Sequence, residues 1–203
     1  GVDRVQAPQL FAASDASRWA PNALSEYDTL RVVGMGKAAL AMAGAVEEAG
    51  PDAALKGTVV VPEGYRESVP DTVSRPAVID VWEGGHPVPT EASVRAGRRL
   101  LEEAEAATAE DLLLVLVSGG GTALSTVPAP GLELADLQRV YHQLLTAGVD
   151  VHRMNAVRKH LTQVGGGQLA QAAGPADVGS LLVSDVVGDD MSVIASGPTV
   201  PDP

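Results

Sequence analysis

Two short glycine-rich runs have the composition of an anion-binding site. Residues 34–37 read GMGK and residues 118–121 read SGGG. Glycine accepts positive φ and leaves neighbouring N–H groups uncovered, which makes room for a phosphate or a carboxylate. Lys37 would stand in the first turn of the next helix, where a positive charge is unfavourable unless an anion is bound. Lys37 is therefore a candidate phosphate-binding residue, and the alternative is a solvated surface lysine.

The GMGK run can be compared with two phosphate-binding motifs. A Walker A loop needs a glycine five positions before its Gly-Lys pair and a Ser or Thr after it, but this chain has Arg31 and Ala38 there. The dinucleotide fingerprint G-x-G-x-x-A does fit residues 34–39. Its acidic partner, about 20 positions further on, is matched only loosely by Glu63. The run alone does not decide between ATP and a dinucleotide.

A basic segment interrupts an otherwise acidic chain. Acids outnumber bases by 26 to 14, yet residues 151–176 contain no Asp or Glu. The pattern predicts a helix near residues 155–164 that Asn155 caps, with Arg158 and Lys159 in its first turn. Positive charge at that end favours an anionic partner. The alternative is a basic surface helix that offsets the acidity of the whole protein.

Carboxylates and a histidine follow two further predicted strands. Asp185 and Asp189 come just after one strand and could hold Mg²⁺ together with substrate phosphates, or act in catalysis. Asp190 is predicted to cap the helix that follows it. His86 stands between glycine and proline and is the histidine most free to face a ligand. Ser118 is not a nucleophile elbow, because G-x-S-x-G is absent.

Alternating strands and helices must position these residues. The unbroken apolar run at residues 112–117 is typical of a strand buried on both faces of a parallel sheet. Further strands are predicted at residues 30–33, 57–61, 77–82 and 178–183, and helices from residue 38 to about 48, from 90 to 104 and from 134 to 145, with Gly148 closing the last. The order predicts an α/β fold, a three-layer α/β/α domain with a mostly parallel Rossmann-like sheet. Ligands of such sheets gather at the carboxyl ends of the strands. Residues 1–29 are predicted to be a helical lead-in.

Composition excludes several classes of function. A formal net charge of −12 and only six aromatic residues argue against nucleic-acid binding. The absence of cysteine excludes disulfides, thiolate catalysis and cysteine-based zinc sites. There is no apolar run near the roughly 20 residues that cross a bilayer, and residues 1–10 lack the plan of a signal peptide. We therefore expect a cytoplasmic protein without nucleic-acid or membrane partners.

Taken together, the motifs resemble those of the glycerate 2-kinase family, some members of which carry the label hydroxypyruvate reductase. The likeness covers about residues 30–203 in six ordered motifs: GMGKAALAMA at 34–43, GGHPVP at 84–89, VSGGGTAL at 117–124, NAVRKHL at 155–161, SDVVGDD at 184–190 and IASGP at 194–198. The resemblance implies transfer of a phosphoryl group from ATP, with Mg²⁺, to D-glycerate, giving 2-phosphoglycerate.

The resemblance and the residue chemistry together give one set of expected site residues. Lys37, Arg158 and Asp189 are the expected catalytic residues. The expected nucleotide- and substrate-binding residues are Gly34, Gly36, His86, Ser118, Gly119, Gly120, Gly121, Asn155 and Lys159. Asp185 and Asp189 are the expected metal ligands.

The family also bears on domain organisation. Its members run to roughly twice this length and carry a second, C-terminal domain that helps to close the cleft. Residues 1–203 are therefore expected to be a single N-terminal α/β domain without the family's C-terminal domain. Its expected protein partner is that missing domain or a further copy of the same chain. Two alternatives to the kinase remain: an NAD(P)H-dependent hydroxypyruvate reductase, and a non-catalytic module that binds a nucleotide or an organic anion.

Overall fold

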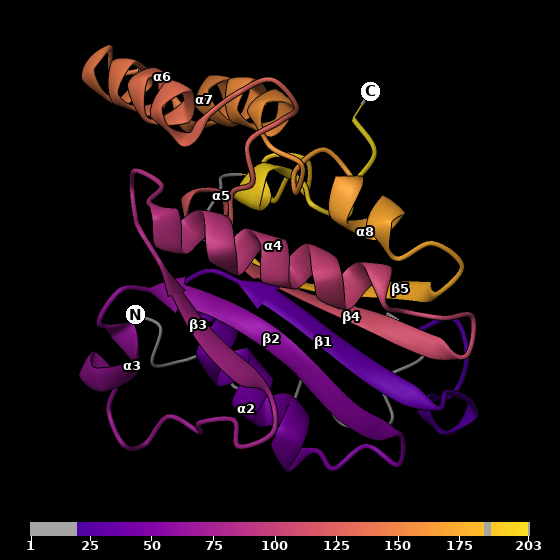
Figure 1. The fold of residues 1–203 in the computed structure, drawn as a ribbon. Coiled ribbons are helices and arrows are strands. Elements are labelled where there is room, and N and C mark those ends of the chain that lie inside the picture. Colours follow the sequence, from indigo (N-terminus) through magenta and orange to yellow (C-terminus); the bar gives the residue numbers. More distant parts are fainter. Residues whose placement is uncertain (1–19, 185–187, 203) are drawn as a thin grey trace.

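A single parallel sheet organises the chain. The computed structural model describes residues 20–184 and 188–202. Its five strands stand in the order β3-β2-β1-β4-β5, and every neighbouring pair is parallel (Figure 1). The strands are β1 (Thr29–Met35), β2 (Ala54–Pro62), β3 (Asp80–Gly84), β4 (Asp111–Ser118) and β5 (Asp177–Val183).

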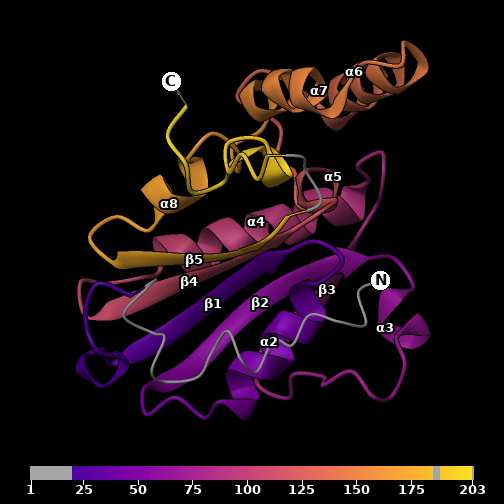
Figure 2. The same ribbon diagram turned by 180° about the vertical axis from the view of Figure 1, so that it is seen from behind.

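Helices cover both faces of the sheet. Helix α2 packs on one face, and α4 and α8 pack on the other, which gives the three-layer α/β/α arrangement predicted from the sequence (Figures 1 and 2). The helices are η3 (Leu24–Glu26), α2 (Ala39–Glu48), α3 (Tyr65–Ser68), α4 (Glu91–Glu105), α5 (Gly121–Leu124), α6 (Leu134–Thr146), α7 (Val151–Arg158), η4 (Lys159–Leu161), α8 (Gln168–Ala172) and η5 (Ile194–Ser196). None of the helices in the described ranges has the length and hydropathy to span a bilayer.

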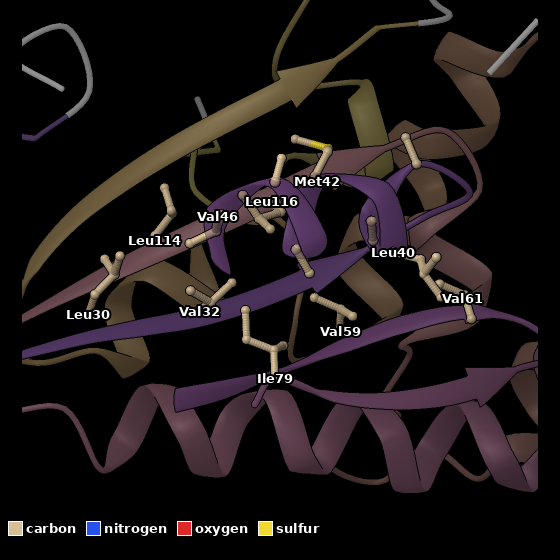
Figure 3. Packing of buried hydrophobic residues seen from close by; sticks show 14 of the residues in the cluster. Leu30, Val32, Leu40, Met42, Val46, Val59, Val61, Ile79, Leu114 and Leu116 are labelled. Carbon is tan, nitrogen blue, oxygen red and sulfur yellow. The ribbon is translucent and has the colours of Figure 1, made fainter. Parts of the chain in front are cut away.

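Strand β4 is buried on both sides, as its unbroken apolar run predicts. Successive side chains of a strand point to opposite faces. Leu114 and Leu116 accordingly pack with α2 in one core cluster, shown in Figure 3. Val115 and Val117 pack with α4 and α8 in the other. Aliphatic side chains dominate both clusters, so the central strands β1 and β4 are buried, whereas the edge strands β3 and β5 are partly exposed.

The connections run outward in both directions from the middle of the sheet. The chain passes from β1 to β2 and β3 on one side, and β4 and β5 lie on the other side. The pairs Thr29↔Asp111 and Met35↔Val117 bound the register between β1 and β4. Such a reversal of strand order leaves a crevice between the loops that follow the two central strands, where sheets of this kind bind ligands.

Several strand boundaries differ from the predicted ones. Strand β2 begins at Ala54 instead of residue 57. Strand β1 continues to Met35 instead of ending at residue 33, because Gly34 lets the side chains of Val59 and Leu116 on the flanking strands come close. Strand β3 begins at Asp80 instead of residue 77. The reason is that the Glu47 carboxylate accepts the N–H groups of residues 77, 78 and 79 at 2.6, 2.8 and 2.7 Å, so these groups are not available to the sheet.

The predicted helical lead-in lies mostly outside the described residues. Of residues 1–29, the structure describes residues 20–29, and the helical part of these is the short turn η3.

A buried ionic network lies at the amino ends of β1 and β4, opposite to the end that carries the glycine-rich runs. The Arg31 side chain reaches Asp111 at 2.7 Å and Glu103 at 3.4 Å. Glu103 also pairs with Arg99, and Asp111 accepts the Thr108 N–H at 3.0 Å. The network therefore connects β1, β4 and α4 at the amino ends of the two strands.

Candidate functional site

The loops after β1 and β4 are bonded to each other at the reversal of strand order. Lys37 N–H donates to Gly119 O at 3.2 Å, and Ala38 N–H donates to Ser118 Oγ at 2.9 Å. Residues 36–38 and 118–121, called the loop pair below, therefore form one unit. The sequence motifs that were predicted to bind an anion meet at the point where the topology favours a ligand.

The contact within the loop pair depends on Gly36. Its φ is +118°, and a Cβ atom built there would lie 2.3 Å from Ser118 Oγ and 2.4 Å from Ser118 O. Real Cβ atoms do not approach so closely, so no other residue fits without a shift of the loop. The hydrogen bonds also take up the N–H groups of Lys37 and Ala38, which a ligand would otherwise use.

Two glycines of the second loop have backbone N–H groups that donate to no described residue. No described residue accepts a hydrogen bond from the N–H groups of Gly120 or Gly121. Gly120 has a φ of +90° and stands before the short helix α5. The exposed side chain of Lys37 makes no ion pair with a described residue. The loop pair thus offers two N–H groups and an ammonium group to a negatively charged molecule.

His86 lies beside the loop pair. A Cβ atom built on Gly120 would lie 3.1 Å from His86 Cδ2 and 3.2 Å from its Nε2, so the imidazole faces this glycine. The loop that carries His86 is fixed to α4 because Gly85 N–H donates to Ser93 Oγ at 2.9 Å. Ser93 in turn accepts the N–H of Thr90, the predicted cap residue of α4. The imidazole itself is exposed.

A strained turn supports the loop pair from the other side. Ala195 and Ser196 have φ values of +47° and +64°, a region that residues with a side chain rarely adopt. Ser196 Oγ lies 3.0 Å from Thr122 Oγ1, and both side chains are buried. A Cβ atom on Gly121 would lie 2.8 Å from the Ala195 Cβ atom. This turn, the last of the sequence motifs, packs directly under the second loop.

Helix α7 begins four residues before the predicted start. Its cap residue is Asp150, whose Oδ1 accepts the N–H groups of His152 and Arg153 at 3.0 and 3.1 Å. The hydrogen bond from the Arg153 N–H is the main cause that lowers the pKa of Asp150. Arg158 is therefore the last residue of α7, where positive charge is favourable without a bound anion, and its predicted place in the first turn of the helix is wrong.

Asn155 has a structural partner instead of the predicted cap position. It lies within α7, is buried, and donates from Nδ2 to Val193 O at 2.8 Å. Val193 precedes the strained turn at Ala195 and Ser196. Asn155 thus connects α7 to the turn beneath the loop pair.

Arg158 has the most unusual surroundings of the predicted site residues. Its exposed fraction is 8 %, yet its Nε and Nη2 atoms have no hydrogen-bond partner among the described residues. Its guanidinium carbon lies 4.0 Å from the centre of the Tyr141 ring. Burial lowers the pKa of Arg158 and raises the pKa of Tyr141 to about 12. Sequence reasoning selected Arg158 by its charge but missed Tyr141, whose only signal was an aromatic ring on the apolar face of α6.

Lys159 is already paired. Its ammonium group contacts a carboxylate oxygen of Asp202, and the other oxygen of Asp202 lies 3.2 Å from His160 Nδ1. The predicted binding role of Lys159 would require it to leave this ion pair. Gly34, another predicted binding residue, lies inside β1 and faces neighbouring strands instead of the loop.

The acidic segment is only partly described. Asp185 lies outside the described residues. Asp189 is exposed and has a φ of +51°. Asp190 caps a turn instead of the predicted helix, because its Oδ1 accepts the N–H and the hydroxyl of Ser192 at 2.9 and 2.7 Å, and the next helix, η5, begins only at Ile194. The Ser192 hydroxyl is the largest cause that lowers the pKa of Asp190. Within the described ranges, no three His, Asp or Glu side chains are grouped as a metal site.

The structure therefore joins some predicted residues and not others. Direct contacts bring together the first loop, the SGGG run and His86, and Asn155 reaches them through the 193–196 turn. A family described as a domain of unknown function, DUF4147, matches residues 1–203. The chain belongs to this family.

Relatives of this DUF4147 domain include proteins with assigned names. It is 45 % identical over 172 residues to a putative hydroxypyruvate reductase of Agrobacterium vitis, covering 85 % of this chain and 38 % of that protein. It is 41 % identical over 175 residues to a D-glycerate 2-kinase of Thermotoga maritima, covering 86 % of this chain and 40 % of that protein. The crystal structure of a glycerate kinase from Thermotoga maritima superposes with a TM-score of 0.75 at 35 % identity, covering 99 % of this chain and 46 % of that one. The DUF4147 domain thus spans less than half the length of each of these relatives.

Proposed function

We propose that this chain is the phosphate-binding domain of a glycerate kinase, which transfers a phosphoryl group from ATP to D-glycerate and yields 2-phosphoglycerate. The observation that carries the proposal is the loop pair, in which two glycine-rich loops meet at the reversal of strand order beside an exposed lysine. The names of the relatives at 41 % to 43 % identity supply the substrate.

Phosphoryl transfer depends mainly on the positioning of the substrates and on the neutralisation of phosphate charge by the protein. The N–H groups of Gly120 and Gly121 would bind phosphate oxygens, and the Lys37 ammonium would neutralise the charge that develops during transfer. Arg158 would supply a second cation. His86 lies beside Gly120 and would contact the same ligand.

Magnesium is the metal that this reaction class uses. Mg²⁺ is commonly bound through one or two carboxylates together with substrate phosphates. Asp189 is exposed in the segment that follows β5 and has no hydrogen-bond partner among the described residues, which fits such a shared site. Asp189 would hold the ion together with Asp185, and the ion would neutralise phosphate charge. We also propose that the protein acts in the cytoplasm.

The test is an assay of ADP release with ATP, Mg²⁺ and D-glycerate, on the longest natural chain that contains these residues. Lys37→Ala should lower kcat by at least about a hundredfold, because one electrostatic contact to a transition state typically contributes that much. Lys56→Ala is the matched control, since Lys56 is an exposed lysine on β2, away from the loop pair. Equal activity of the two variants would remove Lys37 from the mechanism. Absence of ADP release from the unmodified protein would refute the kinase.

A hydroxypyruvate reductase is the second candidate, because two relatives at 45 % identity carry that name. A dinucleotide fingerprint requires its first glycine in the turn after the strand. Gly34 instead lies inside β1, where it admits side chains of neighbouring strands, so this observation favours the kinase. Loss of NADH absorbance with hydroxypyruvate would reverse the preference. Calorimetry that detects nucleotide binding without either turnover would favour the third alternative, a binding module.

A further inference from the structure

The guanidinium group of Arg158 is held in place without an acidic partner. Arg158 makes no ion pair with a described residue, and its buried Nε and Nη2 atoms have no hydrogen-bond acceptor in the same part of the chain. Burial of unpaired donors costs free energy, and a carboxylate would be the usual remedy. A carboxylate, however, would occupy the donors that an incoming anion needs.

The aromatic face of Tyr141 contacts the Arg158 guanidinium group, where a carboxylate would otherwise be expected. The guanidinium carbon lies 4.0 Å from the ring centre, within the range of a cation–π interaction. Tyr141 is fully buried, and it belongs to α6, whereas Arg158 ends α7, so the contact also holds the two helices together. Stacking restrains the long arginine side chain without using its Nε and Nη2 donors, which are buried and have no hydrogen-bond partner among the described residues.

We propose that Tyr141 is a positioning residue that holds the Arg158 guanidinium ready for a negatively charged oxygen group of the substrates. This inference deepens the proposed function and rests on it for its kinetic part. Its structural part, the stacking itself, can be tested separately.

The ring remains suitable for this task at physiological pH. Burial raises the pKa of Tyr141 to about 12, although the positive charge of Arg158 acts in the opposite direction. The phenol therefore stays neutral near pH 7. An ionised tyrosine would pair with Arg158 and cancel the charge that the substrate should meet.

Other contacts also fix α6 to the domain, so removal of the ring need not detach the helix. Gln138 Nε2 donates to Pro89 O at 2.9 Å, and Leu137 is buried. Gln138→Ala therefore offers a matched control that loosens the same helix one turn before Tyr141 and leaves the stack intact.

The first experiment observes the stack by NMR. The Nε–H signal of Arg158, assigned by its loss in Arg158→Lys, should show the ring-current shift of a group above an aromatic face. Tyr141→Phe should retain this shift, and Tyr141→Leu and Tyr141→Met should lose it. Titration with inorganic tripolyphosphate should move the signal in the unmodified protein and in Tyr141→Phe, but far less in the leucine variant. An unchanged signal in a folded Tyr141→Leu or Tyr141→Met protein would overturn the proposal.

The second experiment is a double-mutant cycle in the kinase assay. Tyr141→Leu should lower kcat/KM at least tenfold, Tyr141→Phe should restore it to within about twofold, and Gln138→Ala should leave it nearly unchanged. In an Arg158→Lys background, Tyr141→Leu should cause no further loss. Equal losses in both backgrounds would show a purely structural tyrosine. If the unmodified protein has no kinase activity, the proposed function fails, while the NMR titration still decides whether Tyr141 positions Arg158.

Discussion

Gly36 shows how one residue can serve both a motif and a contact. The sequence selected it because glycines suit phosphate-binding loops. The structure adds that its position lies against Ser118, on a loop about 80 positions further along the chain. The phosphate-binding motif and the contact with Ser118 both require glycine at this position. The motif is visible in the sequence, whereas the contact is visible only in the structure.

We expect Gly36→Ala to destabilise the protein more than an alanine at a glycine without neighbours. Gly50 is the matched control, because its φ is +58° and nothing lies within 4 Å of a Cβ atom built there. Both variants carry backbone strain, and Gly36→Ala also overpacks the loop pair, which should add about 2 kcal/mol to its cost. Urea unfolding of the two variants measures the difference. Equal losses would mean that the loop pair yields easily.

Arg158 marks the limit of prediction at this scale. Its charge and its place in a basic segment were visible in the sequence, so it could be selected as a candidate. Its burial, its unpaired nitrogen atoms and its contact with Tyr141 depend on how α6 and α7 pack. No local pattern contains that information.

At the scale of elements, hydrophobic periodicity predicted which helices and strands form, but side-chain hydrogen bonds determine where some of them begin. The apolar run of β4 predicted a buried central strand, and the structure confirms it. The predicted start of β3 was wrong because the Glu47 carboxylate, 30 or more residues away in the chain, accepts hydrogen bonds from the N–H groups of residues 77 and 78, just before the strand. The predicted start of α7 was wrong for a local reason, since Asp150, just before the basic segment, is a favourable cap residue and begins the helix earlier.

Glu47 should therefore matter more than its position at the end of α2 suggests. Glu47→Ala removes the acceptor of three N–H groups and should cost about 2 kcal/mol in the free energy of unfolding, because hydrogen bonds to a charged group are stronger than average. Glu48→Ala, at the next and exposed position, is the control and should be nearly neutral. Thermal unfolding of both variants provides the measurement. A neutral Glu47→Ala would show that water replaces the carboxylate without loss.

At the scale of the whole molecule, the fold class was predictable because the alternation of strands and helices allows few arrangements. The convergence of the glycine-rich loops also followed, since parallel strands bring their carboxyl ends to one edge of the sheet. The buried ionic network at the amino ends of β1 and β4 was not predicted, because Arg31, Glu103 and Asp111 are charged residues in segments whose pattern indicates a hydrophobic core.

This network should give the protein a specific sensitivity to acid. Burial alone would raise the pKa of Asp111, but hydrogen bonds from Arg31 and the Thr108 N–H outweigh it and leave the pKa below its ordinary value. A lowered pKa stabilises the fold above the ordinary value near 3.8, and this contribution is lost as the pH falls through the pKa of the folded state.

We expect Asp111→Asn to cost about 3 kcal/mol at pH 7, since it breaks a buried ion pair. The difference from the unmodified protein should shrink as the pH falls from 5 toward 3. Asp71→Asn removes an exposed partner of Arg75 and should cost less than about 0.5 kcal/mol at every pH. Urea titrations across this range test the expectation, and a difference that does not vary with pH would contradict it.

The pairing of β1 with β4 also determines when the candidate site can exist. These neighbours are separated in the chain by two strands and three helices, so their association closes a large loop, and we expect it to come late in folding. A ribosome-bound chain that has released only β1 to β3 has no partner for Lys37 N–H and no receptor for an anion. The ability to recognise a ligand therefore arises in the same step that completes the centre of the sheet.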